Sequence, residues 1–313
     1  MEHFLYRLSF TTALHMGKDA GAGSLDDCRM NIHADTIFSA LCCEAARAGE
    51  VNGLADLFAG GALTISDALP YAGDELFLPR PILFINNTRR EGDAGLKKAL
   101  KNVEYIPLSL FADYLLGLRR PQIDVEKFKY KFGRMVVVTR VALKGNDQPL
   151  PYHVAAWKFA RGCGLYLVVR AEHEDARHTF GTLLARLGLS GIGGKQSSGW
   201  GKFEVRQSDV PAGLMELIED SRAQYQMLLG TALPADNELD DVLADGWYAL
   251  VRRGGFICSE NYAPGQMKKR TMYMMAPGSC LRRRFKGGMY DLSDGGTHPV
   301  WRFGNTLFAG VNL

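Results

Sequence analysis

Residues 191–205 read GIGGKQSSGWGKFEV and place five glycines in eleven positions before apolar and polar residues begin to alternate. The preceding run, residues 175–188, carries Phe180 and three leucines at helical spacing and predicts a helix that Gly188 ends. The alternating KFEVRQ that follows predicts a strand. The chain is therefore expected to build a helix, a glycine-rich loop and a strand in succession.

The spacing of this loop excludes two common phosphate-binding motifs. Lys195 is followed by Gln196 instead of serine or threonine, as a P-loop requires, and position 196 is not the third glycine of a dinucleotide fingerprint. Bare backbone and polar donors suit a sugar-phosphate chain, because glycine permits positive φ and close approach. A tightly packed helix-to-strand connection is the alternative. The residues concerned are Gly191, Gly193, Gly194, Lys195, Gln196, Ser197, Ser198, Gly199 and Gly201.

Length and composition indicate a globular protein. The 313 residues are enough for two domains, and 47% are hydrophobic and 23% charged. No apolar run is long enough to cross a membrane, and the start, MEHFLYRLSF, lacks a signal peptide, so we expect a cytoplasmic protein with no membrane partner. The six cysteines form no C-x-x-C pair. We expect no disulfide framework, no metal site and no cofactor.

The charges are unevenly placed, although the net charge is only +3. Residues 119–144 carry eight cations against two carboxylates, and residues 261–290 carry seven cations and no carboxylate. Such basic windows suit a polyanion such as nucleic acid, whereas solvated faces pointing in different directions are the alternative. Residues 236–245 carry five carboxylates and are expected to form a solvated loop. The second window contains the cations Lys268, Lys269, Arg270, Arg282, Arg283, Arg284 and Lys286, interleaved with Tyr262, Tyr273, Phe285 and Tyr290.

Strand and helix patterns repeat along the chain. A strand in residues 3–10 precedes a first loop, residues 15–27, and a helix in residues 34–49 that Asp35 is expected to cap. The run KFKYKF, residues 127–132, predicts a strand with a lysine face and an aromatic face. The aromatic face is expected either to cover a core or to be available to RNA. Residues 134–159 then predict a hairpin that projects from its domain.

A second unit is expected to begin near residue 161, with a helix in residues 208–230. Two successive strand-helix-strand units predict an α+β protein of paired ferredoxin-like sandwiches. The expected domains are residues 1–160, with the hairpin as an insertion, and residues 161–313, with the glycine-rich loop.

The loop resembles that of the CRISPR RAMP proteins, G-x-G-[GK]-x-x-[ST]-x-G-[YWF]-G followed by an apolar strand residue, and every element of this pattern is present in residues 191–205. Residues 15–41, HMGKDAGAGSLDDCRMNIHADTIFSAL, resemble the amino-terminal motif of subunit four of type III-A (Csm) effectors. LKKALKNVEYIPLSLF and GGTHPVWRFGNTLF also resemble that subunit, in matching order.

The resemblance implies two ferredoxin-like (RRM-like) domains, a β-hairpin thumb and a non-catalytic subunit of the interference ribonucleoprotein in antiviral defence. The implied partners are the 5′ handle of CRISPR RNA (crRNA), the large Palm-containing Cas subunit, a backbone RAMP subunit of the Csm complex and, indirectly, target RNA. The hairpin after Arg140 would reach along the guide. Besides the glycine-rich loop, the residues implied to face RNA are His15, Gly17, Lys18, Arg29, Asn31 and His33. The two basic clusters of the second window are candidates on charge alone.

An enzyme is the alternative, because some RAMP relatives cleave repeat RNA without metal through a histidine near this loop. His15 or His33 would then act as general acid or base beside Lys18. We assign His298 and Asp35 structural roles instead. The sequence contains no G-G-D-D motif and no adjacent His-Asp pair, so cyclase and metal-nuclease chemistry would belong to a partner.

Overall fold

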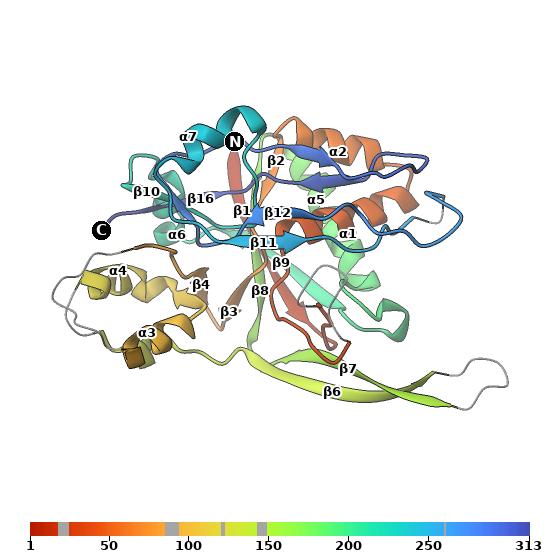
Figure 1. The fold of residues 1–313 in the computed structure, drawn as a ribbon, viewed down its shortest axis with the longest axis horizontal. Helices are drawn as coiled ribbons and strands as arrows, with labels where there is room; N and C mark the ends of the chain where they lie inside the picture. The colour runs from red at the N-terminus through yellow and green to blue at the C-terminus, as the bar shows by residue number, and fades with distance from the viewer. Residues whose placement is uncertain (18–24, 85–93, 120–122, 143–148, 260) are drawn as a thin grey trace.

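An antiparallel sheet forms the centre of the protein in the computed structural model, which describes residues 1–17, 25–84, 94–119, 123–142, 149–259 and 261–313 (Figure 1). Its strand order is β5-β4-β3-β8-β1-β9, and β2 also pairs with β8. Segments far apart in sequence therefore meet, since β1 lies between β8 and β9. The strands are β1 Glu2–Phe10, β2 Leu63–Ile65, β3 Leu69–Ala72, β4 Glu75–Pro79, β5 Tyr105–Pro107, β8 Cys163–Ala171 and β9 Phe203–Asp209.

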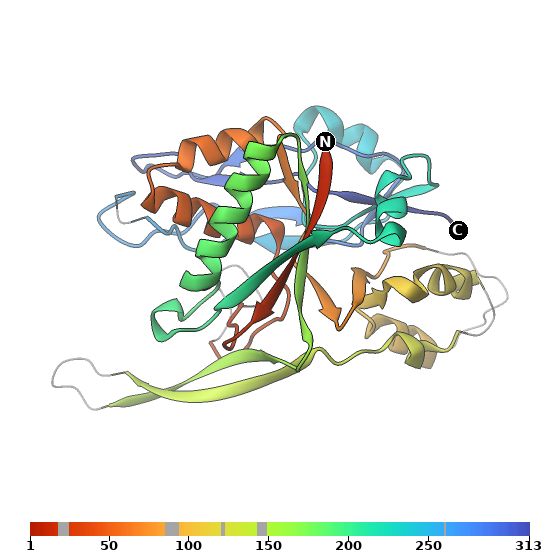
Figure 2. The same cartoon turned by 180° about the vertical axis from the view of Figure 1, so that it is seen from behind.

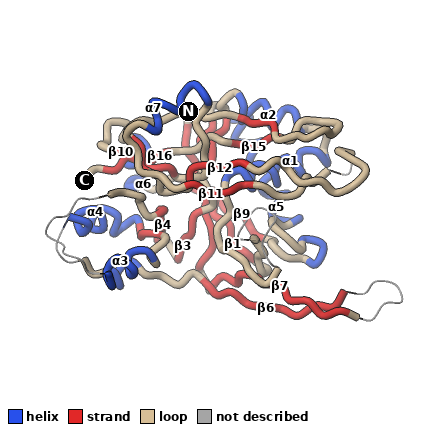
Figure 3. Tube along the Cα trace, in the orientation of Figure 1, coloured by secondary structure: helices blue, strands red, loops and turns tan. Residues whose placement is uncertain are grey.

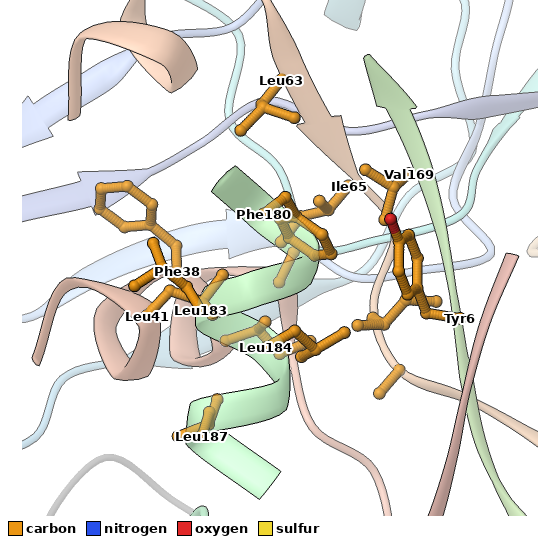
Figure 4. Packing of buried hydrophobic residues seen from close by; sticks show 14 of the residues in the cluster. Tyr6, Phe38, Leu41, Leu63, Ile65, Val169, Phe180, Leu183, Leu184 and Leu187 are labelled. Carbon is orange, nitrogen blue, oxygen red and sulfur yellow. The ribbon is translucent and has the colours of Figure 1, made fainter. Parts of the chain in front are cut away.

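Period-two alternation gives this sheet two buried faces. Tyr6 of β1 lies on the face that helices α1, Ala34–Arg47, and α5, Glu174–Ser190, cover, and its ring meets Phe180 edge-on at 5.4 Å (Figure 4). Leu5 belongs to the core on the opposite face. The packing of α5 against the sheet fixes the start of the glycine-rich loop.

Two helix boundaries differ from those expected. Helix α5 continues through Gly188, which lies against Phe203: a Cβ at that position would be 2.4 Å from the Phe203 carbonyl oxygen. The helix expected in residues 208–230 is shorter, α6 Ala212–Glu219, and is followed by strand β10, Tyr225–Leu228. Strand β10 is buried and pairs with two other strands, so tertiary pairing outweighs helical propensity there.

Smaller sheets begin at β10 (Figure 1), and β15 of the β14-β15 pair packs on α1. Phe303 of β15 meets Phe38 of α1 and Phe58 of α2 at centroid distances of 5.9 and 5.0 Å. The acidic run, residues 236–245, was expected to be a loop but contains a 3₁₀ turn and a short helix. The strands are β11 Leu250–Arg253, β12 Met272–Met275, β13 Cys280–Leu281, β14 Met289–Asp291, β15 Trp301–Phe303 and β16 Phe308–Val311. The other helices are α2 Val51–Ala59, α3 Ala94–Lys101, α4 Phe111–Arg119 and α7 Leu239–Leu243, with 3₁₀ turns at Leu108–Leu110, Val125–Phe128, Gln196–Ser198 and Asp236–Glu238.

The expected hairpin is present: β6, Gly133–Ala142, pairs with β7, Leu150–Phe159, along its whole length. It extends away from the body of the protein in both views (Figures 1 and 2) and stands clear in the tube drawing (Figure 3). The strand expected at 127–132 is wrong, because a 3₁₀ turn begins this run and no strand follows before β6. Phe128 and Phe132 are buried and Tyr130 is exposed.

The expected boundary at residue 160/161 falls between β7 and β8. Strands from both sides of it share the central sheet, since β8 and β9 both pair with β1. No helix among the described residues is long and apolar enough to span a bilayer.

Candidate nucleic-acid interface

The glycine loop, residues 191–201, is a compact turn with several left-handed residues. Gly191 ends α5 with φ 92° and donates its N–H to the Leu187 carbonyl at 2.7 Å. Lys195 adopts φ 65°, a left-handed conformation that is uncommon for a residue with a side chain. The loop closes where the Ile192 N–H donates to the Gly201 carbonyl at 3.0 Å.

Most of the loop's glycines serve contacts within the protein. A Cβ on Gly193 would be 2.5 Å from the His15 carbonyl oxygen, and one on Gly194 would be 2.6 Å from the His15 ring. Cβ atoms on Gly191 and Gly201 would meet loop backbone at 2.5 and 2.0 Å. A Cβ on Gly199 would meet nothing within 4 Å, although the φ of this glycine is 78°. Close packing therefore explains four of the glycines, as the alternative interpretation of the sequence expected.

The first loop and the hairpin both contact the glycine loop. The Gly194 N–H donates to the His15 carbonyl at 2.9 Å, and His15 Nδ1 donates to the Ala155 carbonyl of β7 at 2.6 Å. Arg140 of β6 donates to Ser198 Oγ at 3.0 Å. The structure thus brings together three segments that the sequence singled out separately.

Aromatic rings hold two of the cations at this junction. The Arg140 guanidinium lies over the Trp200 ring, 4.8 Å from its centroid. Lys195 Nζ lies 4.9 Å from the centroid of the Tyr152 ring of β7 and 3.4 Å from its hydroxyl. Trp200 and Tyr152 were not predicted as partners of these cations, although the Trp-Gly pair of the loop motif was a signal for Trp200.

The outer edge of the junction faces solvent. Gln196, Ser197 and Ser198 are exposed, and Lys195 and Arg140 are half-buried. The edge therefore presents amide, hydroxyl and cationic donors side by side, a set that matches phosphate oxygens. Among the described residues no group of three or more His, Cys, Asp or Glu could hold a metal ion.

The residues around the first loop divide into exposed and buried positions. Arg29 is exposed, and its N–H donates to the Met16 carbonyl at 2.7 Å, beside the glycine loop. Asn31 is half-buried, and a Cβ on Gly17 would meet nothing within 4 Å. Lys18 lies outside the described residues.

His33 lies in an internal polar cluster. Its Nδ1 donates to Asp67 Oδ2 at 2.6 Å, and the Thr231 hydroxyl donates to the same carboxylate at 3.1 Å. Asp67 Oδ1 accepts the Ala34 N–H at 2.8 Å, at the start of α1. His33 and His15 are both buried and bonded within the chain, which favours structural roles for both.

Asp35 has a structural role, but the expected capping function is wrong. Its buried carboxylate accepts three hydrogen bonds from Arg253 of β11, at 2.9, 3.1 and 3.2 Å, and one from Arg302 of β15. Burial alone would raise the pKa of this carboxyl, but the two guanidinium groups outweigh it and hold the pKa at about 2. Asp35 therefore ties α1 to the later strands.

The basic clusters of the second window are only partly available to a ligand. Lys269 donates to Ser39 Oγ of α1 at 2.8 Å, and Arg284 donates to the Ile218 carbonyl at 2.8 Å. Arg284 is nevertheless exposed, as are Lys268, Arg270, Arg282, Arg283 and Lys286. Arg270 and Arg282 also donate to the Asp291 and Gln224 carbonyls. Of the interleaved aromatic residues, Tyr262 and Phe285 are buried, Tyr290 is half-buried and Tyr273 is exposed. His298, assigned a structural role, is exposed and contacts Ser259 and Tyr262.

Comparison with known proteins gives consistent matches. Residues 221–311 match the model of the CRISPR Csm4 C-terminal domain. The CRISPR system Cms protein Csm4 of Mycobacterium tuberculosis is 34% identical over 98% of this chain and 97% of its own, and that of Streptococcus thermophilus is 29% identical over 98% of both. In fold, the chain is similar to solved structures of a Csm3-Csm4 subcomplex (TM-score 0.66, 16% identity, all of both chains) and a Csm1-Csm4 cassette with pppApA (TM-score 0.59, 21% identity, 99% and 98%).

Proposed function

Because this chain belongs to the Csm4 family of type III-A CRISPR complex subunits, we propose that it is the non-catalytic subunit that holds the 5′ handle of the guide RNA. The observation that carries the proposal is the junction of the glycine loop, the first loop and the hairpin at Arg140, Lys195 and His15. There, donors from separate segments form a single exposed edge.

The strand order supports a ferredoxin-like (RRM-like) first domain. The antiparallel order β3-β8-β1-β9, with α1 and α5 on one face, is that of a β-α-β-β-α-β sandwich. The glycine loop then connects the last helix and the last strand of this domain. This arrangement favours a domain division after β9, later than residue 160, and makes the β6-β7 hairpin an insertion that serves as the thumb.

In the proposed complex, cationic side chains provide most of the affinity for RNA, and neutral hydrogen-bond donors fix the position of the RNA chain. Lys195 and Arg140 neutralise phosphates, and the exposed hydroxyl and amide groups of residues 196–198 donate to the sugar-phosphate chain. Arg29 and residues 15–17 extend this surface towards the start of α1. Nδ1 of both buried rings makes a hydrogen bond within the chain, and we assign His15 and His33 to shaping the site.

The expected protein partners follow from the relatives. Solved relatives are a Csm3-Csm4 subcomplex and Csm1-Csm4 cassettes. By analogy, this chain docks a large Palm-containing subunit and a backbone RAMP subunit, towards which the hairpin extends, and meets target RNA only through the guide.

Binding of the full-length chain to labelled handle RNA, measured against salt, tests the proposal. We expect preference for the handle over a scrambled RNA, no cleavage without metal, and a log-log salt slope that falls in magnitude by about 0.7 in K195A. Exposed Lys101 of α3, outside the glycine loop and both basic windows, provides a matched control, K101A. If the wild-type chain cleaved the RNA and H15A or H33A abolished that cleavage, the nuclease hypothesis would replace the proposal.

A further inference from the structure

One face of α1 contacts the β11-β12 ribbon, residues 250–259 and 261–275, at three successive levels. Asp35 pairs with Arg253, and Ser39 accepts a hydrogen bond from Lys269. At the third level the ribbon continues through the hydrogen bond from the Ile257 N–H to the Met267 carbonyl, which brings Cys258 to the height of Cys43. The neighbouring Cys258 thiol contributes to raising the pKa of the Cys43 thiol. The helix positions are four residues apart, so they lie on one face and advance by ~6 Å at each level.

The backbone on both sides of the cysteine pair is already ordered. Cys43 lies inside α1, and the segment of Cys258 is held by the Ile257 N–H, which donates to the Met267 carbonyl at 2.9 Å. The Ser39 contact one turn away and the Asp35 contact two turns away fix the distance between helix and ribbon. A bond between the two sulfur atoms would therefore join two segments whose backbone hydrogen bonds are already formed.

The two thiols differ in access. Cys258 is exposed and Cys43 is half-buried, and neither is in a disulfide. The neighbouring Cys258 thiol and burial raise the pKa of the Cys43 thiol. An oxidant therefore meets Cys258 first, and Cys43 is placed to react second.

We propose that Cys43 and Cys258 form an oxidisable pair that, on reaction with a small-molecule disulfide, links α1 covalently to the β11-β12 ribbon. The Cys258 thiolate attacks the small disulfide and releases one thiolate of it, leaving a mixed disulfide. Cys43, losing its proton, attacks the Cys258 sulfur and releases the second thiolate. Two protein thiols lose two electrons and two protons, and the small disulfide is reduced to two thiols.

This link would close a loop of about 215 residues in the unfolded chain and so restrict the unfolded state. We expect the oxidised protein to melt about 5 °C or more above the reduced protein. Dithiothreitol should reverse the increase.

Treatment of the folded full-length chain with oxidised glutathione, followed by alkylation and peptide mass spectrometry, tests the pair. We expect a Cys43–Cys258 cross-linked peptide, loss of two hydrogen masses and a higher Tm. C42S, a neighbour in α1, should keep all three, whereas C43S should stop at a glutathione adduct on Cys258. A Cys42–Cys258 link, a link between chains, or persistent alkylation of both thiols in wild type would overturn the proposal, and none of these outcomes depends on RNA binding.

Discussion

Arg140 of the hairpin lies over the ring of Trp200 in the glycine loop, 4.8 Å from its centroid, while donating a hydrogen bond to Ser198. Two elements separated by helix α5 and strand β8 are thereby fixed to each other. The hairpin stem and the loop edge form one surface.

Replacing Arg140 should break the contact between the hairpin stem and the glycine loop and weaken RNA binding. R140A removes a guanidinium–ring contact worth about 1 kcal/mol and a phosphate-directed charge, so affinity for handle RNA should fall about tenfold at low salt. R140K keeps the charge but loses the planar guanidinium, so its affinity for handle RNA should lie between those of wild type and R140A. Fluorescence anisotropy checks the order. R222A, an exposed arginine outside the hairpin and both basic windows, is the control, and an equal loss in R222A would refute a special role for Arg140.

The two kinds of loop glycine should respond differently to alanine. Gly199 has φ 78° and open space, so G199A should cost about 1 kcal/mol of strain in the free energy of unfolding. Gly193 has φ 90° and a Cβ there would clash with the His15 carbonyl, so G193A should cost more and also weaken RNA binding. Urea unfolding measures both variants. Equal stabilities would show that the packing on His15 contributes little.

Asp35 should be among the most sensitive positions outside the RNA surface. D35A leaves the buried Arg302 without its carboxylate and should lower the free energy of unfolding by about 3–5 kcal/mol. D74A removes a carboxylate that pairs with Arg7 at 3.7 Å on the surface and should cost about 0–1 kcal/mol. Chemical denaturation measures both. Similar values for the two variants would contradict a structural role for the Asp35 cluster.

Acid should weaken the same cluster in a defined range. The folded-state pKa of Asp35 is about 2, below the ordinary value of 3.8, so its contribution is complete above about pH 4 and is lost as the pH falls towards 2. The shift corresponds to about 2 kcal/mol. Unfolding of wild type and D35N between pH 5 and 2 should show a stability difference that narrows towards low pH. A constant difference would mean that the carboxylate is not the group responsible.

Much of the secondary structure could be predicted from local patterns. The helix before the glycine loop, strand β9 after it and the β6-β7 hairpin follow from periodicity and from turn residues. The errors fall where long-range packing decides. Gly188 stays helical because it faces Phe203, and residues after Glu219 become a strand because two other strands pair with them.

The sequence indicated which segments form the candidate site, but not which side chains contact one another there. The loop motif and the basic windows pointed to Lys195 and Arg140, yet no spacing rule could place Arg140 over Trp200, 60 positions later, or Asp67 at the start of α1. Such contacts depend on the sheet order, which joins β1 to strands from the second half of the chain. In the second basic window the sequence overstated the cations available to a ligand, because Lys269 and Arg284 make hydrogen bonds within the chain.

Photo-crosslinking of handle RNA carrying 4-thiouridine, with the adducts mapped on this chain by mass spectrometry, tests the central proposal most directly. We predict adducts on residues 195–200 and 13–17 and on the β6-β7 stem, and their loss when unlabelled handle competes but not when scrambled RNA does. Adducts confined to other surfaces, with residues 191–201 unmodified, would contradict the proposal that the glycine loop holds the guide.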